Sequence, residues 1–381
     1  MYKTTFFCAN ILASVFLLFF SGSVLAQSAD SVRYGVLPSF SYDSDNGINI
    51  SMDLQRFDYS DAIVPFKSYG KYRVSYRGVG AYTFSMFRDQ VQTFNTDKRS
   101  SFDLLVNQNY GNYFPGYTVN GDFSKERFDT TSFYQFNSFL LNIGVTTRVP
   151  ISIIEGLKRT DIKVGLRIVH EKPFDLEPNS FMDTNRPKGW DGSTYTFLEL
   201  GYIKENRDNE FRSKNGNLIA LSFKTSIPLL SSSLIGQVYN EFRVFRQLTK
   251  GENFPEVVFA QRFLMNQTIG NIPYWFAPSL GGSGSVRGYI YRRFVGKGVL
   301  QSNTEIRSWL FKLPWLESQV GISAFTDNAV VYDSSFKDYQ RASTIGFGGF
   351  MSVFNRDFIL KYEMGFSKEG VGVYIGSGFS F

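Results

Sequence analysis

Few side chains in this chain of 381 residues are suited to catalysis. The only histidine is His170, in the segment GLRIVHEKP, so any serine–histidine–aspartate arrangement would have to include it. No G-x-S-x-G motif accompanies it. One histidine and one cysteine, Cys8, cannot supply the ligands of a zinc site. We therefore expect no enzyme, no metal site and no bound cofactor.

A glycine-rich segment around an arginine, SLGGSGSVRGYIYRRF (279–294), suggests a different kind of site. Its central residues are Gly281, Gly282, Gly284, Val286, Arg287, Gly288 and Tyr289. Glycines this close together indicate unusual backbone angles or close packing against another surface. Their spacing fits neither the dinucleotide fingerprint nor the phosphate-binding loop, because no Lys-Ser/Thr follows and nothing downstream has a helical pattern. What Arg287 does therefore depends on the elements around it.

Those elements are predicted to be strands. Apolar residues occupy every second position in the segments 48–55, 358–367 and 371–381, and strict alternation is typical of strands with one apolar and one polar face. The chain contains 40 Phe and 22 Tyr. After residue 26 no apolar run approaches the ~18–20 residues of a membrane-spanning helix, which excludes an ordinary helical membrane protein.

The composition of the polar faces favours a transmembrane β-barrel over a soluble sandwich. These faces mix charged residues with Gly, Ser and Asn, as expected of a wet lumen, while the opposite faces carry the aromatic and aliphatic residues that lipid contact requires. Strands in a bilayer must close into a barrel to pair their edges. Residues 27–381 allow 16 strands at roughly 22 residues per strand and connection. We expect an all-β, antiparallel barrel, with long loops at 107–129 and 171–192.

The first 26 residues have the features of a secretory signal peptide. Lys3 precedes an apolar stretch, and Val24-Leu25-Ala26 provides the small residues of a cleavage site. The polar segment QSADS that follows argues against a retained membrane anchor. The formal charge of +6 comes from charges mixed along the chain, so no nucleic-acid partner is expected.

The last eight residues, YIGSGFSF, resemble the C-terminal signal by which the assembly machinery recognises bacterial outer-membrane barrels. The residues that carry this resemblance are Tyr374, Gly376, Phe379 and Phe381. The alternative is an ordinary final strand that ends in phenylalanine. We expect the alternation, and with it the last strand, to continue to the end of the chain.

The segment LGGSGSVRGY (280–289) resembles the loop-six signature of the Omp85 superfamily, whose members carry the bacterial surface antigen (D15) barrel domain. Further matches follow the family's order, namely Arg207, Asp208, Asn209 and Gly216 in 198–217, Glu305 and Arg307 in NTEIR, and Phe325 and Asp327 in FTDNA. Three residues depart from the pattern: Glu205, Ser213 and Ala329. The family's translocators also carry soluble POTRA domains before the barrel, and we expect this chain to have no room for one.

The resemblance implies that loop six folds into the lumen, where Arg287 pairs with Asp327 and Glu305 and Tyr289 packs against the wall. The alternation agrees, because it places both carboxylates on the polar faces of their strands. A planar guanidinium suits carboxylates, and such bonds are strong in a partly dry lumen. The resemblance further implies that the seam between the first and last strands is weakly paired.

The implied function is assembly, insertion or translocation of proteins at the bacterial outer membrane. The alternative is a passive or gated pore for small solutes. The expected partners are outer-membrane lipids and lipopolysaccharide, the assembly machinery for the protein's own insertion, and client proteins or a periplasmic partner that supplies the missing receiving domain.

Overall fold

The computed structural model describes residues 32–381 except 44–46, 64, 78–79, 122, 156–157, 250–253, 315–317, 335 and 354. The predicted signal peptide, residues 1–26, lies outside the described residues. No helix in the described part of the chain is long and apolar enough to cross a membrane.

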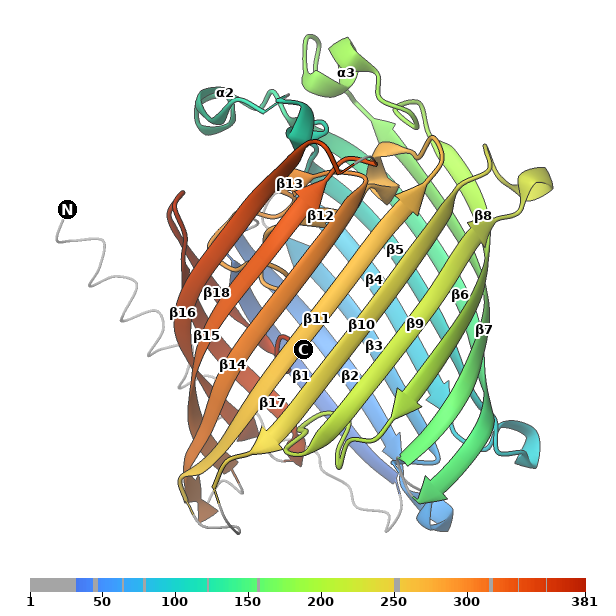
Figure 1. Ribbon diagram of the computed structural model, residues 1–381, viewed down its shortest axis with the longest axis vertical. Helices are drawn as coiled ribbons and strands as arrows, with labels where there is room; N and C mark the ends of the chain where they lie inside the picture. Colours follow the sequence, from blue (N-terminus) through green and yellow to red (C-terminus); the bar gives the residue numbers. More distant parts are fainter. Residues whose placement is uncertain are drawn as a thin grey trace, which may run out of the picture.

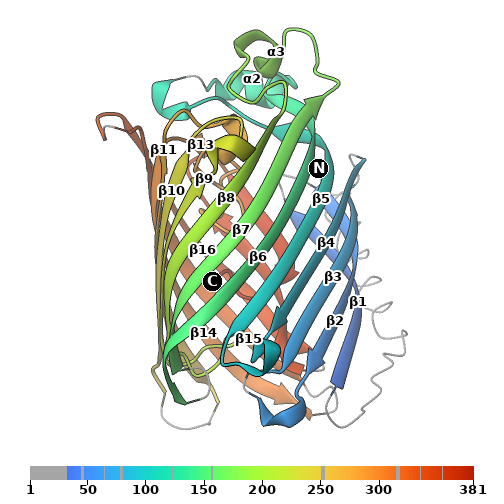
Figure 2. The same ribbon diagram turned by 90° about the vertical axis from the view of Figure 1, so that its right-hand side faces the viewer.

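Sixteen antiparallel strands form one closed barrel (Figures 1 and 2), which confirms the predicted fold class. Sequential strands are neighbours, and β1 closes the barrel against β18. Only β12 and β13 leave this order, because they form a separate two-stranded sheet between β11 and β14. The barrel strands are β1 (Val32–Asp43), β2 (Gly47–Asp58), β3 (Ser68–Arg77), β4 (Ala81–Gln90), β5 (Arg99–Tyr113), β6 (Gln135–Glu155), β7 (Lys158–Phe174), β8 (Ser193–Glu205), β9 (Gly216–Ser226), β10 (Gly236–Gln247), β11 (Glu256–Ile269), β14 (Gly298–Leu313), β15 (Ser318–Tyr332), β16 (Tyr339–Val353), β17 (Asn355–Phe366) and β18 (Val371–Ser377).

The alternation in the sequence determines which face of each strand points outward. In β2, Ile50 and Met52 are exposed on the outer surface, whereas Ser51 and Asp53 are buried inside. Asp53 Oδ1 accepts a hydrogen bond from Arg73 Nε at 2.5 Å. The barrel therefore has an apolar exterior and an interior of paired polar groups, as expected of a barrel whose outside meets lipid.

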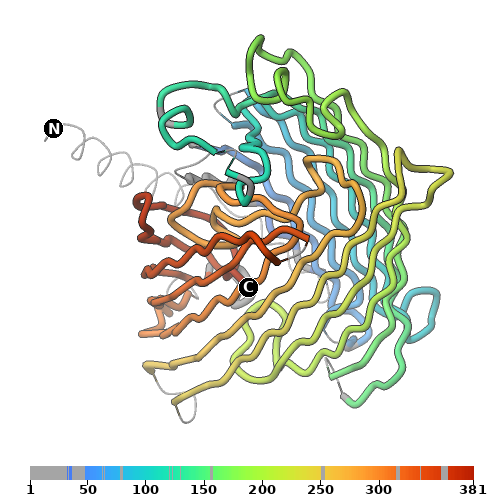
Figure 3. Tube along the Cα trace, turned by 45° about the horizontal axis from the view of Figure 1, so that its top comes forward, coloured from blue at the N-terminus to red at the C-terminus, as the bar shows by residue number. Residues whose placement is uncertain are grey.

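The two ends of the barrel differ in the length of their connections. Three long connections, 114–134, 175–192 and 270–297, gather at what we call the long-loop end (Figures 1 and 3). They contain η3 (Thr118–Asn120), α2 (Lys125–Thr130), α3 (Phe181–Asn185), η5 (Tyr274–Phe276), β12 (Ser279–Leu280) and β13 (Phe294–Val295), and η4 (Pro228–Leu230) lies at the same end. The opposite, short-turn end carries η1 (Ser60–Ala62) and η2 (Thr93–Asn95).

The predicted boundaries of two long loops were wrong. β5 continues to Tyr113 and β7 to Phe174, so 107–113 and 171–174 belong to strands. Polar side chains there indicated a loop, yet strands tolerate them because their inner faces meet a polar lumen. Both segments pair with β6.

An aromatic core joins the three long loops to one another. Phe114 packs against Phe181, and both belong to a buried cluster that includes Tyr274. Thr118 Oγ1 accepts a hydrogen bond from Val295 N at 3.0 Å, which links the 114–134 connection to β13. The long loops therefore form one packed unit over this end of the barrel.

The prediction that the last strand continues to Phe381 was wrong. β18 ends at Ser377, Gly378 adopts a φ of 79°, and the last residues turn into the barrel. The C-terminal end lies within the barrel's outline in Figures 1 to 3. The physical reason is that Phe379 and Phe381 find aromatic partners inside, which period-two alternation cannot reveal.

Candidate functional site in the barrel lumen

The connection 270–297, here called loop 6, places Arg287 against the inner wall of the barrel. Arg287 donates to Asp327 from its backbone N (3.1 Å to Oδ2), from Nε (2.8 Å to Oδ2) and from Nη2 (2.7 Å to Oδ1). Its Nη1 lies 2.8 Å from Glu305 Oε1. Arg287 is 1% exposed, Glu305 2% and Asp327 0%, so these are charge-assisted bonds in a dry environment.

Glu363 on β17 is a third carboxylate partner of Arg287, which the sequence analysis missed. Its Oε1 accepts from Arg287 Nη1 at 2.8 Å. Arg307 donates to the second oxygen of Glu305, and Lys361 pairs with Glu363, each at 2.8–2.9 Å. Three cations thus balance three carboxylates. Alternation predicts that Glu363 and Lys361 lie on the polar face of their strand, but no local sequence pattern predicts that Glu363 contacts Arg287.

The Arg287 guanidinium also stacks on an aromatic ring. Its Cζ lies 3.4 Å from the centroid of Phe325, the distance range of cation–π contacts. Asn303 completes the environment, because its amide donates to Asp327 Oδ1 at 2.8 Å and to the Ser285 carbonyl at 2.9 Å. Asp327 is therefore hydrogen-bonded both by Arg287 of loop 6 and by Asn303 of the neighbouring strand β14.

Three glycines of the loop-6 motif have backbone conformations that a side chain would disturb. Gly281 has a φ of 116°, and a Cβ there would lie 2.0 Å from the Ile290 carbonyl oxygen. Gly288 has a φ of 93°, and its Cβ would lie 2.8 Å from the Gly365 carbonyl oxygen. Gly282 also has a positive φ, of 84°. Gly284 has no positive φ, and an added Cβ would meet no atom within 4 Å, so nothing in the structure explains why glycine occupies this position.

The apolar residues of the motif bury against the wall. Val286 and Tyr289 belong to a cluster with Ala329 of β15, and the Tyr289 ring meets Phe294 edge-on at 5.1 Å. Ala329, where the family pattern has glycine, therefore packs without displacing the loop.

A row of glycines on neighbouring strands makes room for the tip of loop 6. Gly346, Gly365 and Gly372 pair across β16, β17 and β18. A Cβ on Gly365 would lie 2.8 Å from the carbonyl carbon of Arg287. A Cβ on Gly346 would lie 2.2 Å from the Phe325 ring. Gly365 and Gly372 therefore leave room for the backbone of loop 6, and Gly346 leaves room for the Phe325 ring on which Arg287 stacks.

The C-terminal tail, residues 378–381, meets the same network. Ser380 Oγ accepts from Arg287 Nη1 at 3.2 Å and from Lys361 Nζ at 2.6 Å. Arg307 donates to the Phe381 carbonyl at 3.1 Å and stacks over Phe379 at 4.1 Å. The tail is therefore bound to the residues that hold loop 6.

The other C-terminal residues of the sequence motif remain in β18. The Tyr374 hydroxyl accepts from the Gly288 backbone N at 2.9 Å, so the last strand also contacts loop 6 directly. A Cβ on Gly376 would meet no atom within 4 Å, so no close contact explains why glycine occupies this position.

The motif residues of 198–217 shape the connection between β8 and β9, residues 206–215, here called the 206–215 turn. Asp208 accepts from the backbone N of Lys214 and of Asn215 at 2.9 and 3.2 Å. Asn209 accepts in the same way from Phe211 and Arg212. A Cβ on Gly216 would lie 2.0 Å from the Asn206 carbonyl oxygen. Arg207 and Glu205 form a buried pair, so glutamate replaces the family's aspartate here without loss of charge.

The 206–215 turn reaches strands on several sides of the barrel. Glu210 bonds Arg99 of β5 at 2.6 Å, and Phe211 packs on Phe57 of β2 with ring centroids 6.1 Å apart. The Arg212 guanidinium stacks over Trp309 of β14 at 4.1 Å. The turn thus extends across the short-turn end, as a loop that closes an opening would do.

The pKa of Glu210 reflects this contact. Burial alone would raise the pKa of the carboxyl group, but attraction to Arg99 and their hydrogen bonds outweigh burial and hold it below its ordinary value. Glu210 is therefore charged at neutral pH.

The seam between β1 and β18 has a short register. In the described part of β1, Tyr42 and Asp43 pair with Ile375 and Tyr374, and Val32–Ser41 have no partner on β18. By contrast, β1 pairs with β2 along its entire length. Val32–Ser41 of β1 therefore present an open strand edge on this side, and such edges readily pair with another strand.

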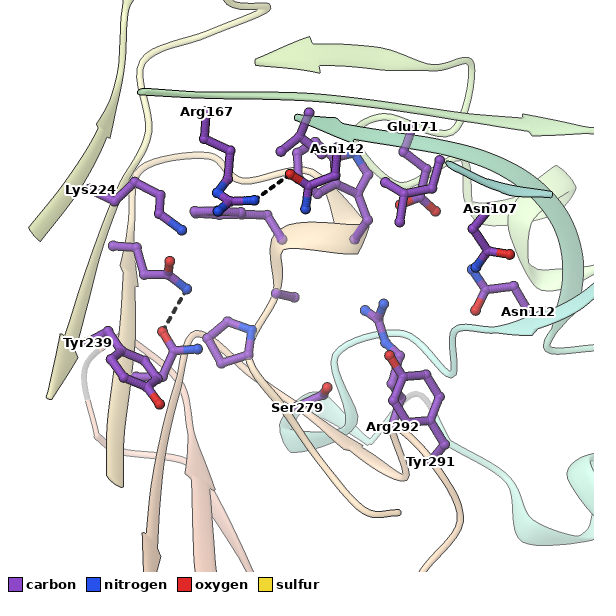
Figure 4. A pocket seen from close by; sticks show the side chains of 18 of the residues that line it. Asn107, Asn112, Asn142, Arg167, Glu171, Lys224, Tyr239, Ser279, Tyr291 and Arg292 are labelled. Carbon is purple, nitrogen blue, oxygen red and sulfur yellow. Dashed lines mark hydrogen bonds between the residues drawn. The ribbon is translucent and has the colours of Figure 1, made fainter. Parts of the chain in front are cut away.

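A cavity of about 1100 Å³, lined by charged and polar side chains as well as by aromatic and aliphatic ones, lies in the lumen next to loop 6. Figure 4 shows side chains from the wall, among them Asn142, Arg167 and Lys224, facing Arg292 of loop 6. The sequence analysis did not foresee this cavity, because its lining comes from strands far apart in the chain.

His170 lies apart from all of these features. Its Nδ1 is 2.8 Å from Thr194 Oγ1, and its ring lies near Phe139. It follows the exposed Val164, Leu166 and Ile168 on the outer face of β7. This position gives no support to a serine–histidine–aspartate site.

The protein is a closed sixteen-stranded barrel, and a loop that carries Arg287 is bound to its inner wall. These two features are typical of one class of outer-membrane barrels. Comparison with protein families identifies the class, because the Omp85 superfamily domain matches residues 68–377. The chain belongs to the Omp85 superfamily. Barrels of this superfamily act in protein insertion or secretion and are transporters or assembly factors.

Solved structures resemble the fold at low sequence identity. BamA from Haemophilus ducreyi lacking POTRA domains 1–3 matches at 13% identity with a TM-score of 0.61, over 97% of this chain and 78% of that one. CdiB from Acinetobacter baumannii matches at 12% identity and a TM-score of 0.57, over 93% of this chain and 60% of that one. CdiB from Escherichia coli matches at 12% identity with a TM-score of 0.58, over 92% of this chain and 68% of that one. The chain thus spans less than two thirds of the Acinetobacter protein. No curated protein matches the sequence significantly.

Proposed function

We propose that this protein is an outer-membrane barrel that inserts or translocates other proteins, with the seam between β1 and β18 as the place where client strands engage. The observation that carries the proposal is the short seam register, in which only Tyr42 and Asp43 of the described β1 residues pair with β18. Unpaired N–H and C=O groups on a strand edge are a template for another strand.

The Arg287 network, which consists of Arg287, Arg307, Lys361, Glu305, Asp327 and Glu363, also supports the proposal. It joins β14, β15 and β17 through Glu305, Asp327 and Glu363, and Tyr374 links β18 to loop 6. A wall braced in this way can keep its shape while the neighbouring seam opens. The family membership and the BamA and CdiB likenesses agree with this role.

The remaining parts of the proposal concern location and partners. The apolar exterior suits the outer membrane, with contacts to its lipids and lipopolysaccharide, and export would use the predicted signal peptide. The long-loop end would face outward and the short-turn end the periplasm. Client proteins, or a periplasmic partner that supplies a receiving domain, would approach from the periplasm, and Tyr374, Gly376, Phe379 and Phe381 would serve recognition by the assembly machinery.

A disulfide across the seam tests the proposal. Ser41→Cys with Gly376→Cys places cysteines where the register would next pair β1 with β18. The only native cysteine, Cys8, lies in the predicted signal peptide. The control pair, Ser51→Cys with Ser75→Cys, occupies opposed positions on β2 and β3.

Quantitative comparison of the outer-membrane proteome after depletion of the wild type is the readout. We expect loss of particular outer-membrane proteins, restored by the control pair and by the reduced seam pair but not by the oxidised seam pair. An unchanged proteome on depletion, or full rescue by the oxidised seam pair, would contradict the proposal.

The second candidate function is a gated pore for small solutes, favoured by the cavity of about 1100 Å³ in the lumen, whose lining includes charged and amide side chains. The aromatic core of the long loops and the 206–215 turn lie at the two ends of the barrel, which favours a gated over a passive pore. Single-channel conductance that rises strongly on deletion of loop 6, without client loss on depletion, would support the pore.

A further inference from the structure

We propose that the luminal cavity binds a hydroxyl-bearing anion, such as a sugar phosphate or a sugar acid. This inference does not depend on the role of the seam. It rests on the side chains that line the cavity of about 1100 Å³ next to loop 6 (Figure 4).

The lining carries an excess of positive charge. Its cations are Arg77, Lys163, Arg167, Lys224 and Arg292, and its carboxylates are Glu171 and Glu199. Five cations against two carboxylates leave the lining a formal charge of +3, of which Asp103, paired with Arg167 just outside the lining, cancels one. Walls of low dielectric concentrate such a field and raise the local concentration of anions.

Two of these cations are not neutralised by a carboxylate within ion-pair distance in the described part of the chain. Lys163 pairs with Glu199 at 2.9 Å, and Arg167 pairs with Asp103 at 2.6 Å. Lys224, in contrast, has the Phe197 ring 5.8 Å from its Nζ. Glu199 attracts Lys224 only from beyond ion-pair distance, and a cation without a closer carboxylate is costly inside a barrel unless water or an anion solvates it.

Arg292 is the second such cation and the more constrained one. It is 6% exposed, and its Nε has no hydrogen-bond partner in the described structure. Its Nη2 donates to the Tyr274 carbonyl at 2.8 Å. Its φ of 58° is left-handed, which is unusual for a residue other than glycine and is often found at ligand sites. Figure 4 shows Arg292 directed into the cavity, opposite Arg167 and Lys224.

The neutral residues of the lining indicate hydroxyl groups on the ligand. Asn107, Asn112 and Asn142 face the cavity (Figure 4). Each amide oxygen already accepts one hydrogen bond within the protein, but an amide oxygen can accept a second and an amide NH₂ group can donate two. A hydroxyl group also does both, whereas an inorganic anion mainly accepts. Trp275 and Tyr239 add flat apolar surface of the kind that commonly lines ligand pockets. Cations and amides together therefore suit an anion that carries several hydroxyls.

Binding to the purified full-length barrel in detergent tests the proposal. Isothermal titration calorimetry would compare glucose 6-phosphate and glucuronate with glucose and inorganic phosphate. We expect saturable binding of the two sugar anions, at least tenfold tighter than glucose or phosphate, which is about 1.4 kcal/mol per factor of ten. Trp275 fluorescence should report the same event, and Trp275→Phe should remove that signal.

Matched variants locate the site. Lys224→Gln on β9 should weaken sugar-anion binding about tenfold, and Arg292→Gln should do the same. Lys204→Gln on neighbouring β8 is the control, because Lys204 is exposed and does not line the cavity. Heat-modifiable migration on gels checks that each variant is folded, and Lys224→Gln provides the test if Arg292→Gln fails to fold.

Three results would overturn the proposal. The first is the absence of saturable binding. The second is equal binding of inorganic phosphate and sugar anions, because it would remove the role of the amides. The third is equal weakening by Lys204→Gln and Lys224→Gln, because it would place binding outside the cavity.

Discussion

Arg287 and Asp327 are joined by three hydrogen bonds, of which one comes from the backbone N of Arg287 and two come from its guanidinium. The backbone bond fixes where the loop lies, and the side-chain bonds fix how the arginine points. Both groups are buried, so removal of Arg287 leaves Asp327 without its cation, whereas removal of Asp327 leaves Arg287 paired with Glu305 and Glu363.

Arg287→Ala should lower the free energy of unfolding of the barrel by about 3–5 kcal/mol, the typical cost of breaking a buried ion pair. Heat-modifiable migration and denaturant titration in detergent would measure it. Arg56→Ala is the control, because Arg56 pairs with Asp58 while 35% exposed and should change stability by about 0–1 kcal/mol. Equal stability of the two variants would argue against a structural role for the Arg287 network.

Gly365→Ala should displace loop 6, because the added Cβ would lie 2.8 Å from the Arg287 carbonyl carbon. We expect a loss of about 1–3 kcal/mol, as for other overpacked sites. Gly349→Ala on β16 is the matched control, since its Cβ meets nothing closer than 3.8 Å. Trypsin cleavage after Arg287 or Arg292 should be faster only in Gly365→Ala, and an intact, protected loop in that variant would refute close packing.

The contact between Glu210 and Arg99 should make stability depend on pH. The pKa of Glu210 is below its ordinary value of 4.5 in the folded protein, because Arg99 outweighs the effect of burial. Its contribution is therefore complete above pH 4.5 and is lost as the pH falls through the folded-state pKa.

Glu210→Gln should remove this part of the pH dependence. Between pH 7 and pH 3, Tm should fall less in Glu210→Gln than in the wild type, because the variant has already lost the contribution. Glu177→Gln, an exposed site in the 175–192 connection, should behave like the wild type. Parallel Tm curves for the wild type and Glu210→Gln would contradict the prediction.

The C-terminal tail should stabilise the barrel through Phe379, whose ring lies 5.1 Å from Phe350 and under the Arg307 guanidinium. Phe379→Ala should therefore lower the free energy of unfolding by about 1–3 kcal/mol. Phe94→Ala, at a ring that is 92% exposed, is the control. If both variants unfold at the same urea concentration as the wild type, the tail does not contribute to stability.

The sequence by itself determined the barrel and the faces of its strands. Alternation is a local property, and each strand's polar and apolar faces follow from it wherever lipid lies on one side. The same reasoning placed Glu305 and Asp327 on the lumen side, and the motif around Arg287 indicated a loop that would meet them. Position along one strand was enough for these inferences.

Only the tertiary structure decided which luminal groups meet. Glu363 reaches Arg287, and Gly346, Gly365 and Gly372 align beneath loop 6, because of the register between strands that the sequence does not encode locally. The inward course of the tail depends on the single φ of Gly378 and on aromatic partners from distant strands. Long-range register and the packing inside a closed barrel emerge only when all sixteen strands are in place, so local patterns cannot report them.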